Sequence, residues 1–399
     1  MALVTSFHND AKSNNSELIC TTKFARIYKF DSKYAIKCID LENCIPPHEP
    51  RFELSILKKL TSQDSSHQNV IKLIEFCETR STDELELFFP WYPLTLQKFM
   101  NDHWKLKNNN NNGTKRRFNP YYNLGIDKQF YNDISNSNIN EGNECDKLEY
   151  INTLDVNKYC LDFFIQLLEG LSFIHKQGII HRDIKPDNIL VQIKEPINLV
   201  IADFGISYDT KNSKQLMQEP LDHKITDIST SFYKAPELLF SCKNYSMAVD
   251  VWSLMVIITQ WFQSKGKYPT VPAIFDNGSN VLDDGNGSDI RLILSIFEKL
   301  GIPSVEEWQE VKMYGSIDAF VGLFGETGNG QYLFNLSIEE QQSKILEYLP
   351  RMNEILDIHL RLTMINCILR MMSLQSDERW HCSELLREIK KNLKDNSTK

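Results

Sequence analysis

The run H-R-D-I-K-P-D-N from His181 to Asn188 constrains this chain more than any other feature, because it sets charged, amide and proline residues at fixed spacing in eight positions. The triplet D-F-G follows at 203–205, and A-P-E follows at 235–237. A lone triplet would carry little information, but three motifs in this order are not a coincidence. Charged residues in loops between regular elements are typical of functional sites. We therefore expect a fold that brings these loops together.

The length of the chain predicts more than one packing unit. It has 399 residues, of which 42% are hydrophobic, and this length exceeds what a single core usually supports. Residues 17–93 read as a small strand-rich lobe with one helix, and residues 94–397 read as a mostly helical lobe. A polar, asparagine-rich insertion is expected at about 101–153. The predicted class is α+β, with two lobes.

Composition argues against several classes of partner. There are 44 basic and 53 acidic residues, so the formal net charge is −9, which disfavours nucleic acid and anionic membranes. Nine cysteines without a C-x-x-C pair favour reduced thiols over disulfides or a zinc site. We expect a cytoplasmic or nuclear protein. The apolar stretch from Val249 to Phe262 contains Asp250 and Gln260, so no membrane span is expected.

Periodicity predicts the regular elements of both lobes. Strands are expected at 18–20, 25–30, 34–39, 70–77 and 85–89, with a helix at 52–60. Prolines 46, 47 and 50 are expected to interrupt regular structure before that helix. Helices are expected from Val156 and at 246–262, 289–300, 340–370 and 383–394. Ser383 is a candidate N-cap for the last helix.

The segment 101–153 has a composition of its own. It contains five consecutive asparagines at 108–112 and a basic run at 115–117, and its apolar residues follow no period. We expect a surface insertion, partly disordered. The basic run could dock a partner, although a solvated charge run is the favoured interpretation.

The motifs supply the groups that phosphoryl transfer needs, which are a proton acceptor, cations for the phosphates and oxygen ligands for a metal. Asp183 is the candidate catalytic base. Lys185 would steady the γ-phosphate of ATP. Asn188 and Asp203 would hold Mg²⁺, which prefers oxygen ligands.

A lysine in a predicted strand completes this set. Lys37 ends the run Y-A-I-K at 34–37, and its ammonium would hold the α- and β-phosphates. Glu53 on the following helix is the candidate partner of Lys37. Glu49 is close by in sequence, but Glu53 is favoured because it borders the apolar stripe of the helix. His181 is expected to be a packed structural residue.

These motifs resemble the eukaryotic protein kinase family, over residues 17–390. Within it, the group holding the cyclin-dependent kinases is most similar, because of H-Q-N-V-I-K-L at 67–73 and I-F-E-K-L-G-I-P-S-V-E-E-W from Ile296. The resemblance implies a two-lobed kinase that uses ATP and Mg²⁺. It also implies an ion pair between Glu237 and Arg379, and a helix at Asp250 that anchors the catalytic loop.

The resemblance further implies where the nucleotide and the substrate hydroxyl would bind. Phe89 would be the gatekeeper, and the backbone of Tyr92 would face adenine in the hinge. Thr230 would contact Asp183 and Lys185 and favour serine and threonine substrates. The implied nucleotide-binding residues are Ile19, Ile27, Ala35, Lys37, Glu53, Phe89, Tyr92, Leu190 and Asp203. The implied regulatory spine is Leu57, Leu73, His181 and Phe204.

The chain departs from the family in its glycines. None precedes Gly113, and Cys20, Thr22 and Ala25 take the positions of the three phosphate-loop glycines. Glycine allows positive φ and close approach of amides to phosphate, so this loop should be stiffer and a poorer anion nest. Met255 replaces a further glycine.

A kinase of this group without loop glycines is similar to the monomeric cyclin-dependent-kinase-activating kinases of budding yeasts. The resemblance implies phosphorylation of the activation-loop threonine of cyclin-dependent kinases, by a monomer with no obligatory cyclin. Two alternatives stay open. One is a cyclin-dependent kinase that needs a cyclin, and the other is a pseudokinase scaffold acting through 101–153.

The activation segment suggests a hypothesis about regulation. Arg182 would usually hold an activation-loop phosphate, but Ile225 occupies the expected phosphosite. Asp222 and Asp227 lie close by, so one of them is expected to pair with Arg182 and remove the need for a phosphate. Lys234 replaces an arginine and lacks its bidentate fork, so proline-directed specificity is doubtful.

Overall fold

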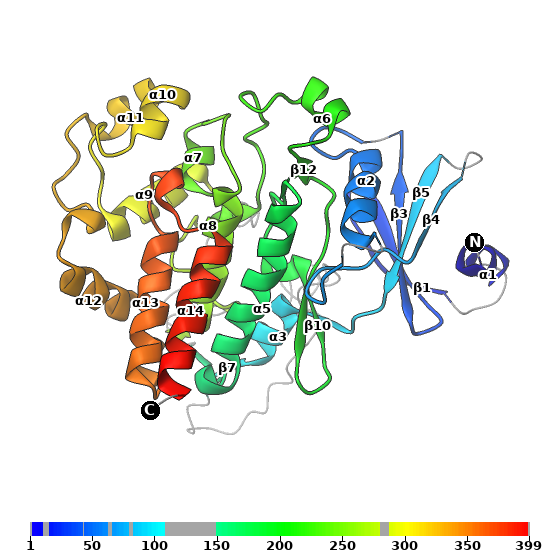
Figure 1. The fold of residues 1–399 in the computed structure, drawn as a ribbon, viewed down its shortest axis with the longest axis horizontal. Coiled ribbons are helices and arrows are strands. Elements are labelled where there is room, and N and C mark those ends of the chain that lie inside the picture. The colour runs from blue at the N-terminus through cyan, green and yellow to red at the C-terminus, as the bar shows by residue number, and fades with distance from the viewer. Residues whose placement is uncertain are drawn as a thin grey trace, which may run out of the picture.

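The chain folds into two lobes, and the predicted α+β class is confirmed (Figure 1). The computed structural model describes residues 2–10, 16–42, 44–62, 66–79, 83–107, 149–279 and 287–397. The strand-rich lobe lies at one end of the molecule and the helical lobe at the other (Figure 1). The A-P-E motif leads into α7 (Pro236–Leu239) inside the helical lobe, where Glu237 is buried.

The small lobe is built on an antiparallel sheet with strand order β1-β2-β3-β5-β4. The strands are β1 (Ser16–Thr21), β2 (Ala25–Phe30), β3 (Tyr34–Asp40), β4 (Glu75–Thr79) and β5 (Glu84–Pro90). Successive strand residues alternate between faces. Ile36 and Cys38 of β3 therefore join one apolar cluster, while Lys37 points to the opposite face.

A helix covers each face of this sheet. Helix α2 (Pro50–Thr61) buries Ile56 and Leu57 against the face that carries Lys37. Helix α1 (Ala2–Asp10), which the sequence did not predict, sets the Phe7 ring 5.6 Å from Phe30 and 6.0 Å from Phe88 on the other face. The sheet is thereby held between two apolar layers.

Two expectations for this lobe are corrected. Pro50 begins α2 instead of interrupting regular structure, because the N–H of the first helical residue has no partner within the helix. Glu49 caps the helix by accepting a hydrogen bond from the N–H of Arg51. The strand expected at 70–77 begins only at Glu75. Val70 instead bridges to Ile201 of the large lobe, so this stretch connects the lobes.

The large lobe contains the remaining helices and several short strands. Its helices are α3 (Leu96–Asp102), α5 (Val156–Lys176), α6 (Ser213–Gln218), α7 (Pro236–Leu239), α8 (Ala248–Trp261), α9 (Asp289–Leu300), α10 (Gln309–Tyr314), α11 (Ile317–Phe324), α12 (Ile338–Tyr348), α13 (Ile358–Met371) and α14 (Cys382–Ser397). Its strands are β6 (Leu94–Thr95), β7 (Trp104–Leu106), β8 (Tyr150–Asn152), β9 (Ile179–Ile180), β10 (Ile189–Gln192), β11 (Asn198–Ile201), β12 (Tyr208–Asp209) and β13 (Lys265–Gly266).

Two helix expectations in this lobe were wrong in detail. The helix expected at 340–370 is two helices, α12 and α13, separated by a 3₁₀ turn that begins at Pro350. Proline lacks the N–H that would continue the helix. Helix α14 begins at Cys382, so Ser383 lies inside its first turn and is not the N-cap.

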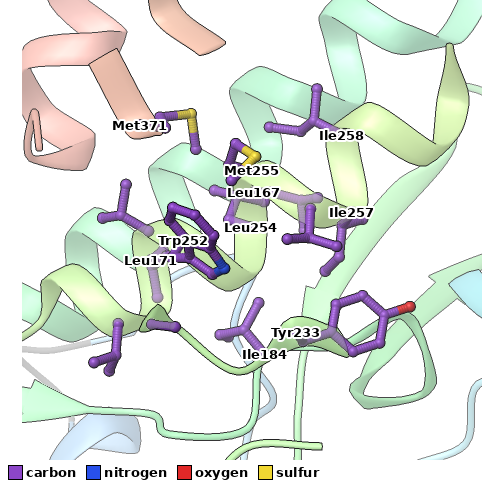
Figure 2. Packing of buried hydrophobic residues seen from close by; sticks show 14 of the residues in the cluster. Leu167, Leu171, Ile184, Tyr233, Trp252, Leu254, Met255, Ile257, Ile258 and Met371 are labelled. Carbon is purple, nitrogen blue, oxygen red and sulfur yellow. The ribbon is translucent and has the colours of Figure 1, made fainter. Parts of the chain in front are cut away.

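The central helix α8 forms the middle of the core. All of its residues from Ala248 to Trp261 are buried, including Met255 at a position where glycine was expected. Met255 is fully buried in the same cluster as Leu167 of α5 and Met371 of α13 (Figure 2). The thioether therefore fills space between three helices. Among the described residues, no helix is long and apolar enough to cross a membrane.

Candidate active site

Three charged side chains from three different elements meet between the lobes. Lys37 Nζ of β3 lies 2.7 Å from Glu53 Oε1 of α2 and 2.8 Å from Asp203 Oδ1, in the loop after β11. Burial disfavours the charge of Lys37, but the two carboxylates outweigh burial and raise its pKa. Glu53 is the glutamate that the structure brings to Lys37, while Glu49 caps the helix.

The same contacts hold Asp203 ionised. Desolvation opposes its charge, yet the ammonium of Lys37 more than compensates and keeps the pKa of Asp203 well below its usual range. Half of the Asp203 side chain stays exposed, so this carboxylate remains accessible to a ligand. For Glu53, burial is the larger effect and raises its pKa.

The D-F-G glycine lies beside the ion pairs. A Cβ added to Gly205 would lie 3.3 Å from Asp203 Oδ1 and 3.5 Å from both Glu53 Oε2 and Lys37 Nζ. The left-handed backbone at this motif belongs to Asp203, whose φ is 62°, not to the glycine. A side chain at position 205 would therefore contact the paired groups, and Asp203 Oδ1 would have to shift by a few tenths of an ångström.

The catalytic loop supplies a second cluster of polar groups. Thr230 Oγ1 donates to Asp183 Oδ1 at 2.7 Å and accepts from Lys185 Nζ at 2.8 Å. Lys185 also lies 2.8 Å from Asp183 Oδ2. Asn188 Nδ2 donates to the Asp183 backbone oxygen at 2.8 Å and to its Oδ2 at 2.9 Å. The structure brings together all four residues predicted for catalysis.

The buried carboxylate of Asp250 binds the backbone of the catalytic loop. Asp250 of α8 accepts from the N–H groups of His181 (2.8 Å) and Arg182 (2.9 Å) and lies 2.9 Å from His175 Nε2. Arg182 has a φ of 72°, which costs energy for a residue with a side chain. The Asp250 contacts stabilise this strained conformation, as the resemblance implied for this helix.

One contact of the predicted spine and the second predicted ion pair form. The rings of His181 and Phe204 are 4.9 Å apart, and Leu57 and Leu73 are buried in the same cluster. His181 is fully buried, as expected of a structural residue. Glu237 and Arg379 pair through two contacts of 2.7 Å, with neither side chain exposed.

The residues predicted to bind the nucleotide come from both lobes. Ala35 of β3 faces Phe89 of β5 in the sheet register, and Ile27 of β2 faces Lys37. Leu190 lies in β10, which pairs with β6 just after Tyr92. These apolar residues are half-buried, while Ile19, in a β1 that carries a bulge, is exposed.

The prediction that Asp222 or Asp227 pairs with Arg182 was wrong. Its guanidinium donates from Nη1 to Glu219 Oε2 (3.0 Å) and from Nη2 to Glu219 Oε1 (2.5 Å). Asp222 pairs instead with the adjacent His223, and Asp227 is fully exposed, 3.7 Å from Lys234. In sequence, Glu219 lies six residues before Ile225, farther from it than Asp222 or Asp227. Glu219 also accepts from the Ile225 N–H (2.8 Å), a contact that only the folded segment creates.

A further ion pair escaped the sequence analysis. Lys59, near the end of α2, contacts Asp209 of β12 at 2.8 and 2.9 Å. Both side chains are partly shielded from solvent, the aspartate more so. This contact ties the helix that carries Glu53 to the segment after D-F-G.

Comparison with known proteins agrees with this geometry. The protein kinase domain model matches residues 137–388, so the match leaves out the glycine-free lobe. The serine/threonine-protein kinase CAK1 of Saccharomyces cerevisiae is 45% identical over 94% of this chain and 97% of its own length. The serine/threonine-protein kinase csk1 of Schizosaccharomyces pombe is 34% identical over 39% of this chain and 46% of its own.

Solved structures support the fold. The yeast RNA polymerase II CTD kinase CTDK-1 complex contains a chain with a TM-score of 0.58 at 19% identity, covering 94% of this chain and 92% of that one. A chain of the Chaetomium thermophilum CAK complex bound to ATP-γ-S scores 0.57 at 18% identity, covering 96% and 93%. From the family match and the similarity to CAK1, this chain belongs to the protein kinase family.

Proposed function

We propose that this kinase phosphorylates the activation-loop threonine of cyclin-dependent kinases, with ATP and Mg²⁺, as a monomer that needs no cyclin. The observation that carries the proposal is that Lys37, Glu53 and Asp203 are already paired in the single chain. Kinase catalysis requires this lysine–glutamate pair and the D-F-G aspartate to be in place together. The similarity to CAK1 over almost the whole chain supports the same substrate class.

The catalytic loop can accept a proton from a substrate hydroxyl. Asp183 already accepts a hydrogen bond from the hydroxyl of Thr230 at 2.7 Å, within the range expected of a general base and its substrate. Lys185 lies beside both groups and offers a cation near the transferred phosphoryl. This arrangement favours hydroxyl substrates of serine and threonine.

The donor set fits a magnesium ion. Asp203 offers an exposed carboxylate held ionised, and Asn188 offers its amide oxygen, since the amide nitrogen is engaged by Asp183. Within the described residues, no three His, Cys, Asp or Glu side chains cluster as a metal site, so nucleotide phosphates would complete the coordination. Bound there, the ion would neutralise phosphate charge.

Contacts within the chain replace what a cyclin would have to provide. A cyclin would act by holding the helix that bears Glu53, and here α2 is held by the pairs Lys37–Glu53 and Lys59–Asp209. The catalytic loop is joined to the activation segment through Arg182 and Glu219. These contacts favour the proposed monomeric activator over a kinase that needs a cyclin.

The scaffold alternative is disfavoured by the same geometry. Glu53 and an ionised Asp203 both pair with Lys37, which is the arrangement that phosphoryl transfer from ATP requires and that a scaffold would not need. The scaffold alternative was based on the missing loop glycines. A measurement of nucleotide binding by the purified chain tests it directly.

The test is phosphoryl transfer by the purified chain alone. It is incubated with Mg²⁺-ATP and an unphosphorylated cyclin-dependent kinase, and the labelled residue is identified by mass spectrometry. We expect the substrate's activation-loop threonine to be labelled without cyclin, and Asp203→Asn to abolish labelling. No labelling with or without cyclin would contradict the proposal and favour the scaffold. Labelling that appears only when cyclin is added would favour a cyclin-dependent kinase.

A further inference from the structure

The turn between β1 and β2, where kinases carry phosphate-loop glycines, is closed by its own side chain. Thr22 Oγ1 accepts from the N–H groups of Ala25 (3.0 Å) and Phe24 (3.4 Å) and donates to the Ala25 carbonyl (3.1 Å). The Thr22 N–H donates to the same carbonyl at 2.8 Å. Amides committed within the turn cannot also form an anion nest. Any contribution of this turn to nucleotide binding therefore comes from something other than these three amides.

The tip of the turn is attached to a different part of the small lobe. Phe24 stacks on the imidazole of His48, with ring centroids 3.9 Å apart and planes at 29°. His48 lies in the segment just before α2, where its N–H donates to Ile45 at 2.9 Å. Both rings are half-buried. The stack thus joins the turn to the segment that leads into the helix carrying Glu53.

This stack lies beside the charged groups of the active site. Burial has the largest effect on the His48 ring and lowers its pKa, and the charges of Asp203, Lys37, Asp183 and Lys23 also act on it. The stack therefore holds the turn against the segment that leads into α2, whose Glu53 pairs with Lys37.

We propose that Phe24 and His48 form a clasp that holds the glycine-free turn over Lys37 and Asp203 and so positions the nucleotide. The inference rests on the nucleotide site of the proposed function. A glycine-rich loop raises the affinity for ATP because its amides approach the phosphates. A turn held by the clasp would raise this affinity because it is already ordered before ATP binds. Phe24 and His48 are positioning residues that act through the turn.

Kinetics of four variants test the clasp. Phe24→Ala and His48→Ala should each raise KM for ATP about fivefold and weaken ADP binding equally, with kcat little changed. The double variant should be no worse than either single, because both remove one contact. His48→Phe, which keeps an aromatic partner, should restore KM. Phe76→Ala is the control, since Phe76 is an exposed aromatic residue on β4, away from the turn.

The outcomes separate the clasp from the proposed function. If the wild-type chain binds ADP and KM is unchanged in Phe24→Ala and His48→Ala, the clasp is wrong and the kinase stands. A lower KM in those variants would also overturn it, because the stack would then obstruct the nucleotide. A wild-type chain that binds no nucleotide would contradict both. Thermal unfolding of each variant excludes loss of folding as the cause.

Discussion

Arg182 is a buried cation next to the catalytic base. Its side chain is fully buried, bonds to Glu219 through both NH groups and lies over the ring of Tyr208 at 4.4 Å. A buried guanidinium is tolerated only when it is paired, and a carboxylate is the simplest partner. Because Glu219 also binds the Ile225 N–H, one side chain joins the catalytic loop to the activation segment.

We predict that Glu219→Gln lowers both activity and stability. The amide keeps the shape but removes the charge, and breaking a buried ion pair costs about 3–5 kcal/mol. We expect at least about a tenfold fall in kcat and a lower Tm, measured by steady-state kinetics and thermal unfolding. Asp222→Asn, at an exposed carboxylate, should change neither.

Phosphatase treatment gives the complementary test of Arg182. If Glu219 provides the negative charge, the treated wild-type chain should keep its activity. A treated preparation that loses nearly all activity would show that a phosphate is needed and that the Glu219 contact is not sufficient.

Helix α2 shows how one element can be fixed without a partner protein. Glu53 in its first turn is held by Lys37, its apolar stripe is buried against the sheet, and Lys59 near its end is held by Asp209. The sequence predicted the stripe and Glu53, because both follow helical spacing. It could not predict the Lys59 contact, since Asp209 is 150 residues away and neither residue belongs to a motif.

We predict that Lys59→Met weakens cyclin-independent activity by loosening the end of α2. The pair is partly buried, so its loss should cost on the order of 1–2 kcal/mol, seen as a several-fold lower kcat and a lower Tm. Lys58→Met is the matched control, because Lys58 lies over the exposed ring of Phe76 instead. Partial recovery in the swapped pair Lys59→Asp/Asp209→Lys would identify the ion pair as the cause, and an unchanged Lys59→Met would refute it.

At the scale of the whole molecule, both ends of the predicted insertion 101–153 belong to the fold. Strands β7 and β8 pair with each other, and β13 pairs with β8. Lys107 and Glu149 are joined by a backbone hydrogen bond of 2.8 Å and a side-chain contact of 2.6 Å. Residues 108–148, with the basic run at 115–117, lie outside the described residues.

We predict that replacing 108–148 by a short Gly-Ser turn leaves phosphoryl transfer intact. Lys107 and Glu149 are already neighbours, so the turn would close the β7–β8 hairpin without moving the catalytic loop. Activity on a generic protein substrate and on a cyclin-dependent kinase should be measured side by side. Loss of both activities would contradict the prediction, while loss of only the second would place substrate docking in the deleted segment.

The sequence by itself determined the lobes, the catalytic loop and the identity of its charged residues, because motif spacing and short-range periodicity are local properties. Tertiary structure decided the rest. Glu219 pairs with Arg182, Phe24 stacks on His48, and Pro350 begins the turn that divides a predicted helix. Of these three features, only the proline could have been recognised in the sequence. The Arg182–Glu219 and Phe24–His48 contacts join residues that have no fixed spacing in the sequence. They form only when folding brings distant segments together, because a buried charge must then be paired.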